Sequence, residues 1–206
     1  MSEPTVSEVV IDRLPLYLRM LQFLEKEGKR VTSSQELAER LGFSSAQIRK
    51  DLSYFGGFGK QGTGYNVAFL QKQLRRILHV DQVWDVALIG VGDLGHALAN
   101  YQGFLEQGFR LVALFDDAPR KIGLTIGSLT VQGMTELVRV VREKNLKMVI
   151  LAVPAEAAQK IVDQLVELGV RAILNYAPIT LSVPPDVRLH YIDPVTGLQS
   201  MAYYLK

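Results

Sequence analysis

The chain has 206 residues, of which 48% are apolar, 23 are Lys or Arg, 21 are Asp or Glu and none is Cys. This composition predicts one or two globular domains and excludes a disordered, collagen-like or coiled-coil chain. The lack of cysteine excludes disulfides, Cys-ligated zinc and iron–sulfur clusters, and it fits a reducing compartment. The longest apolar run, residues 148–155, is far shorter than the ~20 residues of a membrane-spanning helix, and the N-terminal sequence does not resemble a signal peptide. We therefore expect a soluble cytoplasmic protein with no membrane association.

Charge is distributed unevenly along the chain. Residues 1–80 contain 12 basic and 8 acidic side chains, whereas residues 81–206 contain 11 basic and 13 acidic ones. Within the first part, residues 49–76 contain six cations and a single acid, Asp51. Such a local excess favours phosphate backbones as partners, although a solvated basic surface is an alternative on charge alone.

The first 80 residues show helical spacing of apolar side chains. This spacing predicts an amphipathic helix over residues 11–27. A second helix is predicted over residues 34–41, between a run of capping residues and a glycine, and a third starts at Ser44 or Ser45 and runs to residue 55. Two short helices joined by a glycine turn predict a helix-turn-helix.

The third helix has two chemically distinct faces. Ile48 and Leu52 fall on one face at 100° per residue, and the opposite face is centred on Ala46, Lys50 and Ser53. Small, hydrogen-bonding and cationic side chains are what a helix needs to approach phosphates and base edges in a major groove. We expect DNA contacts from Ser44, Ser45, Gln47, Arg49, Lys50, Ser53 and Tyr54.

A glycine-rich segment follows this helix. Residues 56–64 contain five glycines, which favours a tight hairpin from which Lys60 would reach a narrow groove. A flexible linker is the alternative, but Phe58 and Tyr65 flank the segment and a helix is predicted again over residues 66–78. A helix-turn-helix followed by such a hairpin predicts a winged-helix DNA-binding domain.

From about residue 86, short Val-, Ile- and Leu-rich runs alternate with helical stretches, the pattern of a doubly wound parallel sheet. The buried strand predicted over residues 86–89 runs into a GxGxxG sequence and then a helix over residues 96–105. In this context the first glycine allows a tight turn, the second lets the backbone approach a pyrophosphate, and the third lets the helix pack close to the strand. The predicted nucleotide turn comprises Gly90, Val91, Gly92, Asp93, Leu94 and Gly95.

A carboxylate follows about where the GxGxxG dinucleotide-binding fingerprint expects one. The strand predicted over residues 109–115 ends at Asp116, 21 residues after Gly95. A carboxylate at this point binds the ribose 2'-hydroxyl of NAD and repels the 2'-phosphate of NADP, so we expect NAD or NADH, although basic residues follow closely. An ordinary turn before Pro119 is the alternative role for Asp116 and Asp117.

Further strands and a crossover helix are predicted at residues 148–153, 155–168, 172–175 and 189–192. In an open parallel sheet, ligands lie outside the carboxyl ends of the strands. Val153 at one such end is expected in the nucleotide site. Asn175 and Tyr176 either line the nicotinamide side or close turns.

The last residues, 197–206, include several bulky apolar groups. A helix this short is not stable alone and is too apolar to remain in water, so it docks against this subunit or a second one. Exchange between subunits would give a dimer. The predicted division is a winged-helix domain over 1–80, a Rossmann-like NAD(H)-binding domain over 81–193 and a dimerisation helix over 194–206.

Two motifs in different domains resemble one known family. The stretch from Gln47 to Gly56, QIRKDLSYFG, followed by the GVGDLG turn and the FDD sequence, is similar to the Rex family of redox-sensing transcriptional repressors. The resemblance covers essentially the whole chain. It implies a homodimer that binds an inverted-repeat operator, stays on DNA when NAD prevails and releases DNA when NADH binds.

The resemblance also implies a sensing network. Arg19 corresponds to an arginine that pairs with an aspartate at the domain interface, here Asp193, and Tyr101 corresponds to a tyrosine that competes for this aspartate when NADH is bound. From the residues alone, Arg19 would lie on a solvated helix face and Tyr101 would be a packed helix residue. Pro194 stands where some relatives carry an aromatic residue.

Other functions fit parts of the sequence. An NAD-dependent oxidoreductase would need an acid or base in a substrate crevice, but the three histidines, His79, His96 and His190, suggest no catalytic dyad. A regulator that binds coenzyme A or another nucleotide, and an NAD-binding interaction protein with no DNA role, are further alternatives. We predict a DNA-binding NADH sensor without catalytic activity or a metal site.

Overall fold

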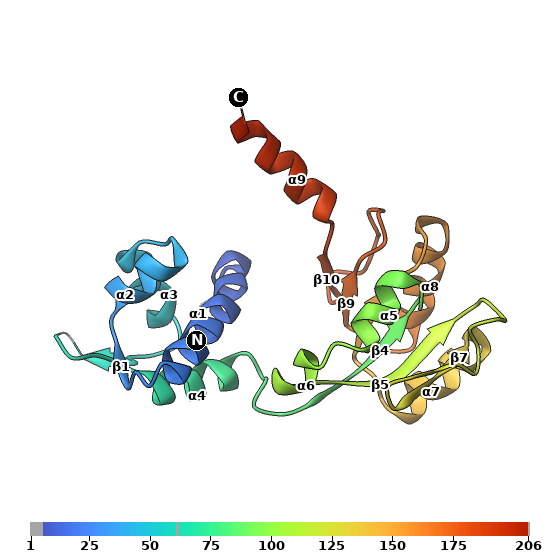
Figure 1. Cartoon of the computed structure of the whole chain (residues 1–206), viewed down its shortest axis with the longest axis horizontal. Coiled ribbons are helices and arrows are strands. Elements are labelled where there is room, and N and C mark those ends of the chain that lie inside the picture. The colour runs from blue at the N-terminus through green and yellow to red at the C-terminus, as the bar shows by residue number, and fades with distance from the viewer. Residues whose placement is uncertain (1–5, 61, 206) are drawn as a thin grey trace. The chain divides into compact units, whose positions relative to one another are not determined.

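The computed structural model describes residues 6–60 and 62–205. The chain divides into two compact units, Met1–Gln82 and Val83–Lys206 (Figure 1). In the described part of the chain, no helix is long and apolar enough to cross a membrane.

The first unit combines helices with a small antiparallel sheet. Its helices are α1 (Glu8–Lys26), α2 (Ser34–Leu41), α3 (Ser45–Ser53) and α4 (Val67–Ile77). Its strands, β1 (Val31–Thr32), β2 (Gly59–Lys60) and β3 (Gly64–Asn66), pair in the order β1-β3-β2. The predicted helix-turn-helix and glycine-rich hairpin are both present, and Gly42 takes the left-handed conformation, φ 73°, between α2 and α3. The short strand β1, which the sequence did not predict, adds a third strand to the hairpin.

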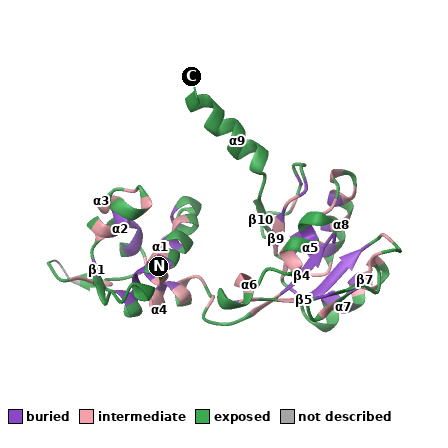
Figure 2. Cartoon of the chain, viewed as in Figure 1, coloured by how far each residue is buried: buried purple, intermediate pink, exposed green. Residues whose placement is uncertain are grey.

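One apolar core holds the first unit together. Leu14 and Leu21 of α1, Ile48 of α3, and Leu70 and Leu74 of α4 are all fully buried in it. The purple segments of Figure 2 show this core in the helices. Helical spacing in the sequence therefore places one side of each helix in the core and leaves the other side free.

The second unit is built on a mostly parallel sheet. Its strands are β4 (Trp84–Ile89), β5 (Phe109–Asp116), β6 (Thr125–Ile126), β7 (Leu129–Gly133), β8 (Met148–Leu151), β9 (Ala172–Asn175) and β10 (Arg188–Tyr191). They are arranged in the order β10-β9-β8-β4-β5-β7-β6, and only the pair β6 and β7 is antiparallel. The chain moves outward from β4 to β5 and β7 and then returns to β8 on the other side of β4. This reversal places a ligand crevice at the carboxyl ends of β4, β5 and β8.

Helices cover both faces of this sheet. Ala87 and Ile89 of β4 pack in one cluster with α7 (Leu137–Glu143) and α8 (Ala155–Glu167). Val86 and Leu88 pack in a second cluster with α5 (Asp93–Ala99) and α6 (Gly103–Glu106). Successive side chains of a strand point to opposite faces, so a strand covered on both faces reads as a continuous apolar run.

The prediction of one helix over residues 96–105 is wrong. The helix ends after Ala99, and α6 begins only at Gly103. At the end of α5, the Asn100 side chain donates a hydrogen bond of 3.0 Å to the His96 carbonyl. Tyr101 lies in the break, 60% exposed, with its ring edge against Phe104, so it is not the packed helix residue that the sequence allowed as an alternative.

The segment between β5 and β8 contains elements that the sequence did not predict. They are the short strands β6 and β7, a single 3₁₀ turn over Met134–Glu136, and α7. Each is short, seven residues at most for α7, so its periodicity is too brief to recognise.

The second unit ends in α9 (Pro194–Ala202) and a 3₁₀ turn over Tyr203–Leu205. Asp193 caps α9 by accepting a hydrogen bond of 2.8 Å from the Val195 N–H. The apolar side chains of α9 are exposed: Val195 is 55%, Leu198 61% and Met201 57% accessible, and Figure 2 shows the helix entirely in green.

Candidate functional site

The helix α3 presents a polar face to solvent. Its N-cap, Ser44, accepts a hydrogen bond of 3.1 Å from the Gln47 N–H, while Ile48 and Leu52 are buried beneath the helix. Lys50, on the opposite face, is exposed. Of the predicted DNA-binding side chains, those of Ser44, Arg49, Lys50, Ser53 and Tyr54 are exposed and those of Ser45 and Gln47 are half-buried.

Two of these side chains are held in place. Arg49 donates a hydrogen bond of 3.0 Å from Nη1 to Ser34 Oγ at the start of α2, and Ser53 donates one of 2.7 Å to the Lys50 carbonyl. The backbone of Lys60 pairs with Gly64 in the β2–β3 hairpin, but its side chain lies outside the described residues. The surface of α3 therefore offers cations and hydrogen-bonding groups together.

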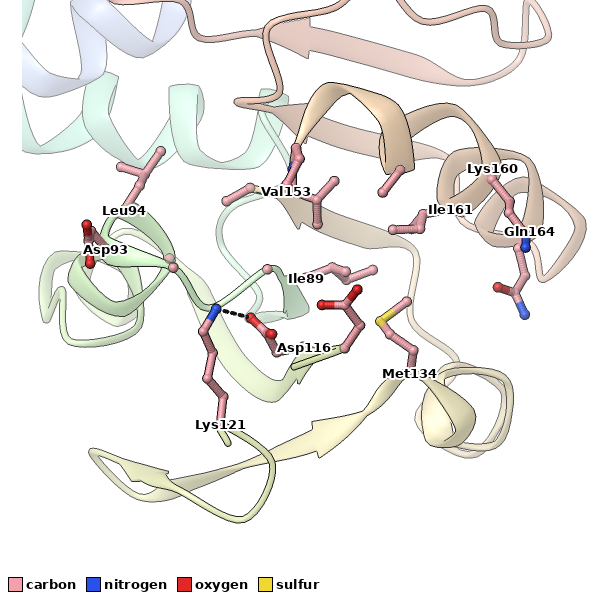
Figure 3. Close-up of a pocket in the computed structure, with 17 residues that line it drawn as sticks. Ile89, Asp93, Leu94, Asp116, Lys121, Met134, Val153, Lys160, Ile161 and Gln164 are labelled. Atoms are coloured by element: carbon pink, nitrogen blue, oxygen red, sulfur yellow. Dashed lines mark hydrogen bonds and ion pairs between the residues drawn. The ribbon is translucent and has the colours of Figure 1, made fainter. Parts of the chain in front are cut away.

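The second unit contains a cleft of about 620 Å³ at the carboxyl ends of β4, β5 and β8 (Figure 3). It is lined by Ile89, Gly90, Gly92, Asp93, Leu94, Gly95, Asp116, Asp117, Lys121, Met134, Ala152, Val153, Pro154, Ala157, Lys160, Ile161 and Gln164. The cleft joins the glycine turn, the end of β5 and the first turns of α8. Its size is that of a small-molecule site.

The three glycines of the turn differ in what a side chain at each position would contact. Gly90 has φ 90°, and a Cβ there would lie 2.2 Å from the Ala152 carbonyl oxygen. A Cβ on Gly95 would lie 1.9 Å from the Gly90 carbonyl oxygen. A Cβ on Gly92 would meet no atom within 4 Å, although this residue lines the cleft. Protein packing therefore requires Gly90 and Gly95, whereas Gly92 borders open space in the cleft.

Asp116 is the buried anion of the cleft, with 5% exposure. Its Oδ2 accepts hydrogen bonds from the Val91 N–H at 2.7 Å and from Lys121 Nζ at 2.9 Å, and its Oδ1 accepts one from the Ala118 N–H at 2.9 Å. The strand β5 thus ends with its carboxylate attached to the backbone of the glycine turn. The side chain of Val91 packs in the core instead of lining the cleft.

These donors keep the carboxylate charged. Burial opposes ionisation of Asp116, but the Lys121 ammonium and the two backbone N–H groups outweigh it and lower its pKa below the ordinary value of 3.8. Asp116 is therefore a fixed acceptor at neutral pH, and Figure 3 shows its ion pair with Lys121.

Val153 lines the cleft, whereas Asn175 does not, and the cofactor-binding role expected for each stays a prediction. The Asn175 side chain is 1% exposed and accepts a hydrogen bond of 2.9 Å from the Ala177 N–H while it donates one of 3.0 Å to the Ala177 carbonyl. It closes the turn after β9, which is the second of the two roles that the sequence left open. Tyr176 packs beside one apolar cluster of the sheet, where burial raises the pKa of its hydroxyl.

Several lining residues were not predicted from the sequence. They include Met134, Lys160, Ile161 and Gln164. The last three lie in α8, which begins directly after β8 and so starts at the same edge of the sheet as the glycine turn. Helical spacing of residues 157, 160, 161 and 164 was a signal that could have identified this wall of the cleft.

The members of the expected sensing network are exposed within their own units. Arg19 lies on the accessible side of α1, Tyr101 lies in the break after α5, and Asp193 caps α9. Their pairing stays a prediction. Within residues 6–60 and 62–205, no group of three or more His, Asp or Glu side chains is placed to hold a metal ion.

Comparisons with known proteins find matches for both units of the chain. A family profile described as "Putative DNA-binding protein N-terminus" matches residues 5–53, and one described as "CoA binding domain" matches residues 81–179. The chain is 57% identical over 198 residues to the redox-sensing transcriptional repressor Rex of Chloroflexus aurantiacus, covering 96% of this chain and 93% of that relative. It is 54% identical to Rex of a Roseiflexus species, covering 100% and 92%.

Solved structures extend this likeness. A crystal structure of RSP in complex with beta-NAD+ and operator DNA has a TM-score of 0.92 at 41% identity, covering 98% of this chain and 93% of that one. A crystal structure of RSP in complex with beta-NADH has a TM-score of 0.90 at 39% identity, covering 98% and 95%. A further structure describes RSP as a Rex-family repressor. High identity along almost the whole chain shows that this protein belongs to the Rex family of redox-sensing transcriptional repressors.

Proposed function

We propose that this protein is a transcriptional repressor that binds an inverted-repeat operator when NADH is low and releases DNA when NADH binds. The observation that carries the proposal is the presence in one chain of an exposed cationic helix in a winged-helix unit and a glycine-turn cleft with a buried carboxylate. The relatives reported above are redox-sensing transcriptional repressors.

For DNA, the exposed face of α3 is the reading surface. Lys50, Arg49, Gln47 and Ser53 would enter a major groove, and Ser44, Ser45 and Tyr54 would contact the flanking backbone. Lys60 would reach the adjacent minor groove from the hairpin.

For the nucleotide, the cleft fits an NAD-type dinucleotide. The open space at Gly92 suits a pyrophosphate, and Oδ1 of Asp116 has the capacity to accept a ribose hydroxyl in addition to the Ala118 N–H. When NAD or NADH is bound, the repressor responds to the oxidation state of its nicotinamide ring. RSP has been solved with both redox forms of this coenzyme, which favours NAD and NADH over coenzyme A.

For the dimer, α9 is the exchanged element. Its exposed Val195, Leu198 and Met201 need an apolar partner, and a second copy of this chain would supply one. Arg19 would pair with Asp193 in one state, and Tyr101 would take over Asp193 when NADH is bound.

The test separates the two binding activities of the full-length protein. Lys50→Ala should weaken binding to a labelled inverted-repeat DNA by about 1–3 kcal/mol and leave the NADH dissociation constant unchanged. Asp116→Ala should raise the NADH dissociation constant at least about tenfold, because a charged hydrogen-bond acceptor is lost, and leave ligand-free DNA binding unchanged. Fluorescence anisotropy and NADH fluorescence report the two constants. Wild-type protein that binds neither ligand would contradict the proposal.

A further inference from the structure

The recognition helix contains a buried acid that the proposed function does not use. Asp51 of α3 is 2% exposed and follows Lys50 directly in the chain. It lies on the side of the helix that faces the core, so it cannot contact DNA. In the sequence it was only the single acid in a cationic stretch.

Three hydrogen bonds from α1 hold this carboxylate. Arg13 donates from Nε to Oδ2 at 2.6 Å and from Nη2 to Oδ1 at 2.8 Å, and Tyr17 donates from its hydroxyl to Oδ2 at 2.6 Å. Arg13 and Tyr17 lie one turn apart on α1, so a single stripe of that helix holds the last turn of α3 through Asp51. We name Arg13, Tyr17 and Asp51 the anchor cluster.

The anchor cluster also reaches the start of the recognition helix. The Tyr17 ring packs edge-on against Phe43, with ring centroids 5.9 Å apart, and Phe43 lies in the turn between α2 and α3. Tyr17 is fully buried, so it contacts the turn through its ring and the helix through its hydroxyl.

Electrostatics keep the cluster charged. Burial opposes ionisation of Asp51, but the hydrogen bonds from Arg13 and Tyr17 outweigh it and lower its pKa, while the bond to Asp51 raises the pKa of Arg13. A bidentate arginine–carboxylate pair has one favoured geometry, whereas the surrounding leucine contacts are non-directional. The cluster therefore fixes the rotation and position of α3 on α1 more tightly than apolar packing alone.

We propose that Arg13, Tyr17 and Asp51 are positioning residues for operator recognition, which set the angle at which Arg49 and Lys50 meet the DNA. The proposal rests on the proposed DNA-binding function. Because base edges demand precise placement and phosphates tolerate movement, a loosened α3 would lose discrimination between operator and other DNA before it loses general affinity.

The experiment compares full-length variants at one salt concentration. Tyr17→Phe removes one hydroxyl and keeps the ring, Asp51→Asn removes the charge, and Arg13→Lys keeps the charge without the bidentate geometry. Anisotropy gives the dissociation constants for an inverted-repeat operator and for a scrambled duplex. Arg40→Gln is the matched control, because Arg40 forms a bidentate ion pair with Glu27 that joins α2 to the end of α1 without involving α3.

The ratio of operator to scrambled affinity should fall about five- to tenfold in Tyr17→Phe, the equivalent of one hydrogen bond, and further in Asp51→Asn. Arg13→Lys should recover part of this ratio relative to Asp51→Asn. Arg40→Gln should leave the ratio within about twofold. In all four variants the NADH dissociation constant should equal that of the wild type. Amide hydrogen exchange in α3 of DNA-free protein should be faster in the three anchor-cluster variants and unchanged in Arg40→Gln.

If Asp51→Asn does not fold, Tyr17→Phe decides the outcome, because it keeps both charges. A ratio and α3 exchange rates equal to those of the wild type in Tyr17→Phe would overturn the positioning role. If wild-type protein does not bind the operator, the proposed function fails instead. The exchange rates of α3 then still test whether the cluster fixes the helix, and unchanged rates would overturn that as well.

Discussion

The ion pair of Asp116 and Lys121 keeps a negative charge in the cleft. The carboxylate is ionised because Lys121 and two backbone N–H groups outweigh the effect of burial. Its folded-state pKa lies below the ordinary value of 3.8, so the stabilisation it provides is present above that value and is lost as pH falls through the lowered pKa. Binding that depends on the charged form should therefore be insensitive to mild acid.

Lys121→Met removes the side chain that most lowers the pKa of Asp116, so this pKa should rise. We expect the NADH affinity of this variant to begin to fall at a higher pH than that of the wild type as the solution is acidified from about pH 7 to pH 5. NADH fluorescence titrations across this range measure the difference. Lys160→Met is the control, since Lys160 lines the same cleft from α8 and the substitution removes the same charge. Equal pH profiles for the two variants would argue against control of Asp116 by Lys121.

The glycines of the turn give a second prediction about single residues. Gly92→Val should fold with an unchanged melting temperature, because a Cβ there meets no protein atom, yet it should lose NADH binding. Gly95→Val should instead destabilise the second unit by at least about 1–3 kcal/mol, because its Cβ would meet the Gly90 carbonyl oxygen. Thermal unfolding and NADH titration of both variants separate the two effects. A Gly92→Val variant that binds NADH normally would refute a ligand at this point.

The positions of cleft residues were predictable where a short motif fixes them, and their binding roles stay predictions. The distance from Gly95 to Asp116 in the sequence identified the carboxylate before any geometry was known. The role of Asn175 could not be assigned, because a side chain at a strand end reaches either the cleft or its own turn. The anchor cluster was not predictable either, since residues 13, 17 and 51 meet only through tertiary packing.

Among the helices, α9 stands out because its apolar side chains are exposed. It is the apolar helix whose side chains remain accessible, and its N-cap is a predicted member of the sensing network. An amphipathic segment of this kind is stable only when something covers its apolar face.

Leu198→Asp combined with Met201→Asp should therefore convert a dimer into monomers, because two charges would enter the apolar contact. Analytical ultracentrifugation measures the change. Leu124→Asp serves as a comparison, since Leu124 is also exposed and lies outside the predicted dimerisation segment 194–206. An unchanged sedimentation coefficient in the double variant would contradict exchange of α9.

The sequence predicted elements well where periodicity was long or caps were present. The helix α2 matches its predicted range because Ser33 caps its start and Gly42 ends it. The break between α5 and α6 was missed, because apolar periodicity does not register a local contact such as the hydrogen bond from the Asn100 side chain to the His96 carbonyl. The strands β6 and β7 were missed because each is only a few residues long.

For the whole molecule, the chain joins a unit with the features of DNA recognition to a unit with the features of dinucleotide binding. The order of these units and the doubly wound topology followed from the change in apolar spacing near residue 80 and from the glycine turn. The coupling between them does not follow from either unit alone. We propose that nucleotide state alters the spacing of the two recognition helices in a dimer.

The most direct test is a titration of the wild-type protein, bound to a labelled inverted-repeat DNA at fixed salt, with NADH and separately with NAD. Fluorescence anisotropy follows release of the DNA. The account predicts that NADH releases the DNA and that NAD at the same concentration does not. DNA binding that is indifferent to both nucleotides, while NADH still binds the protein, would contradict redox control of repression.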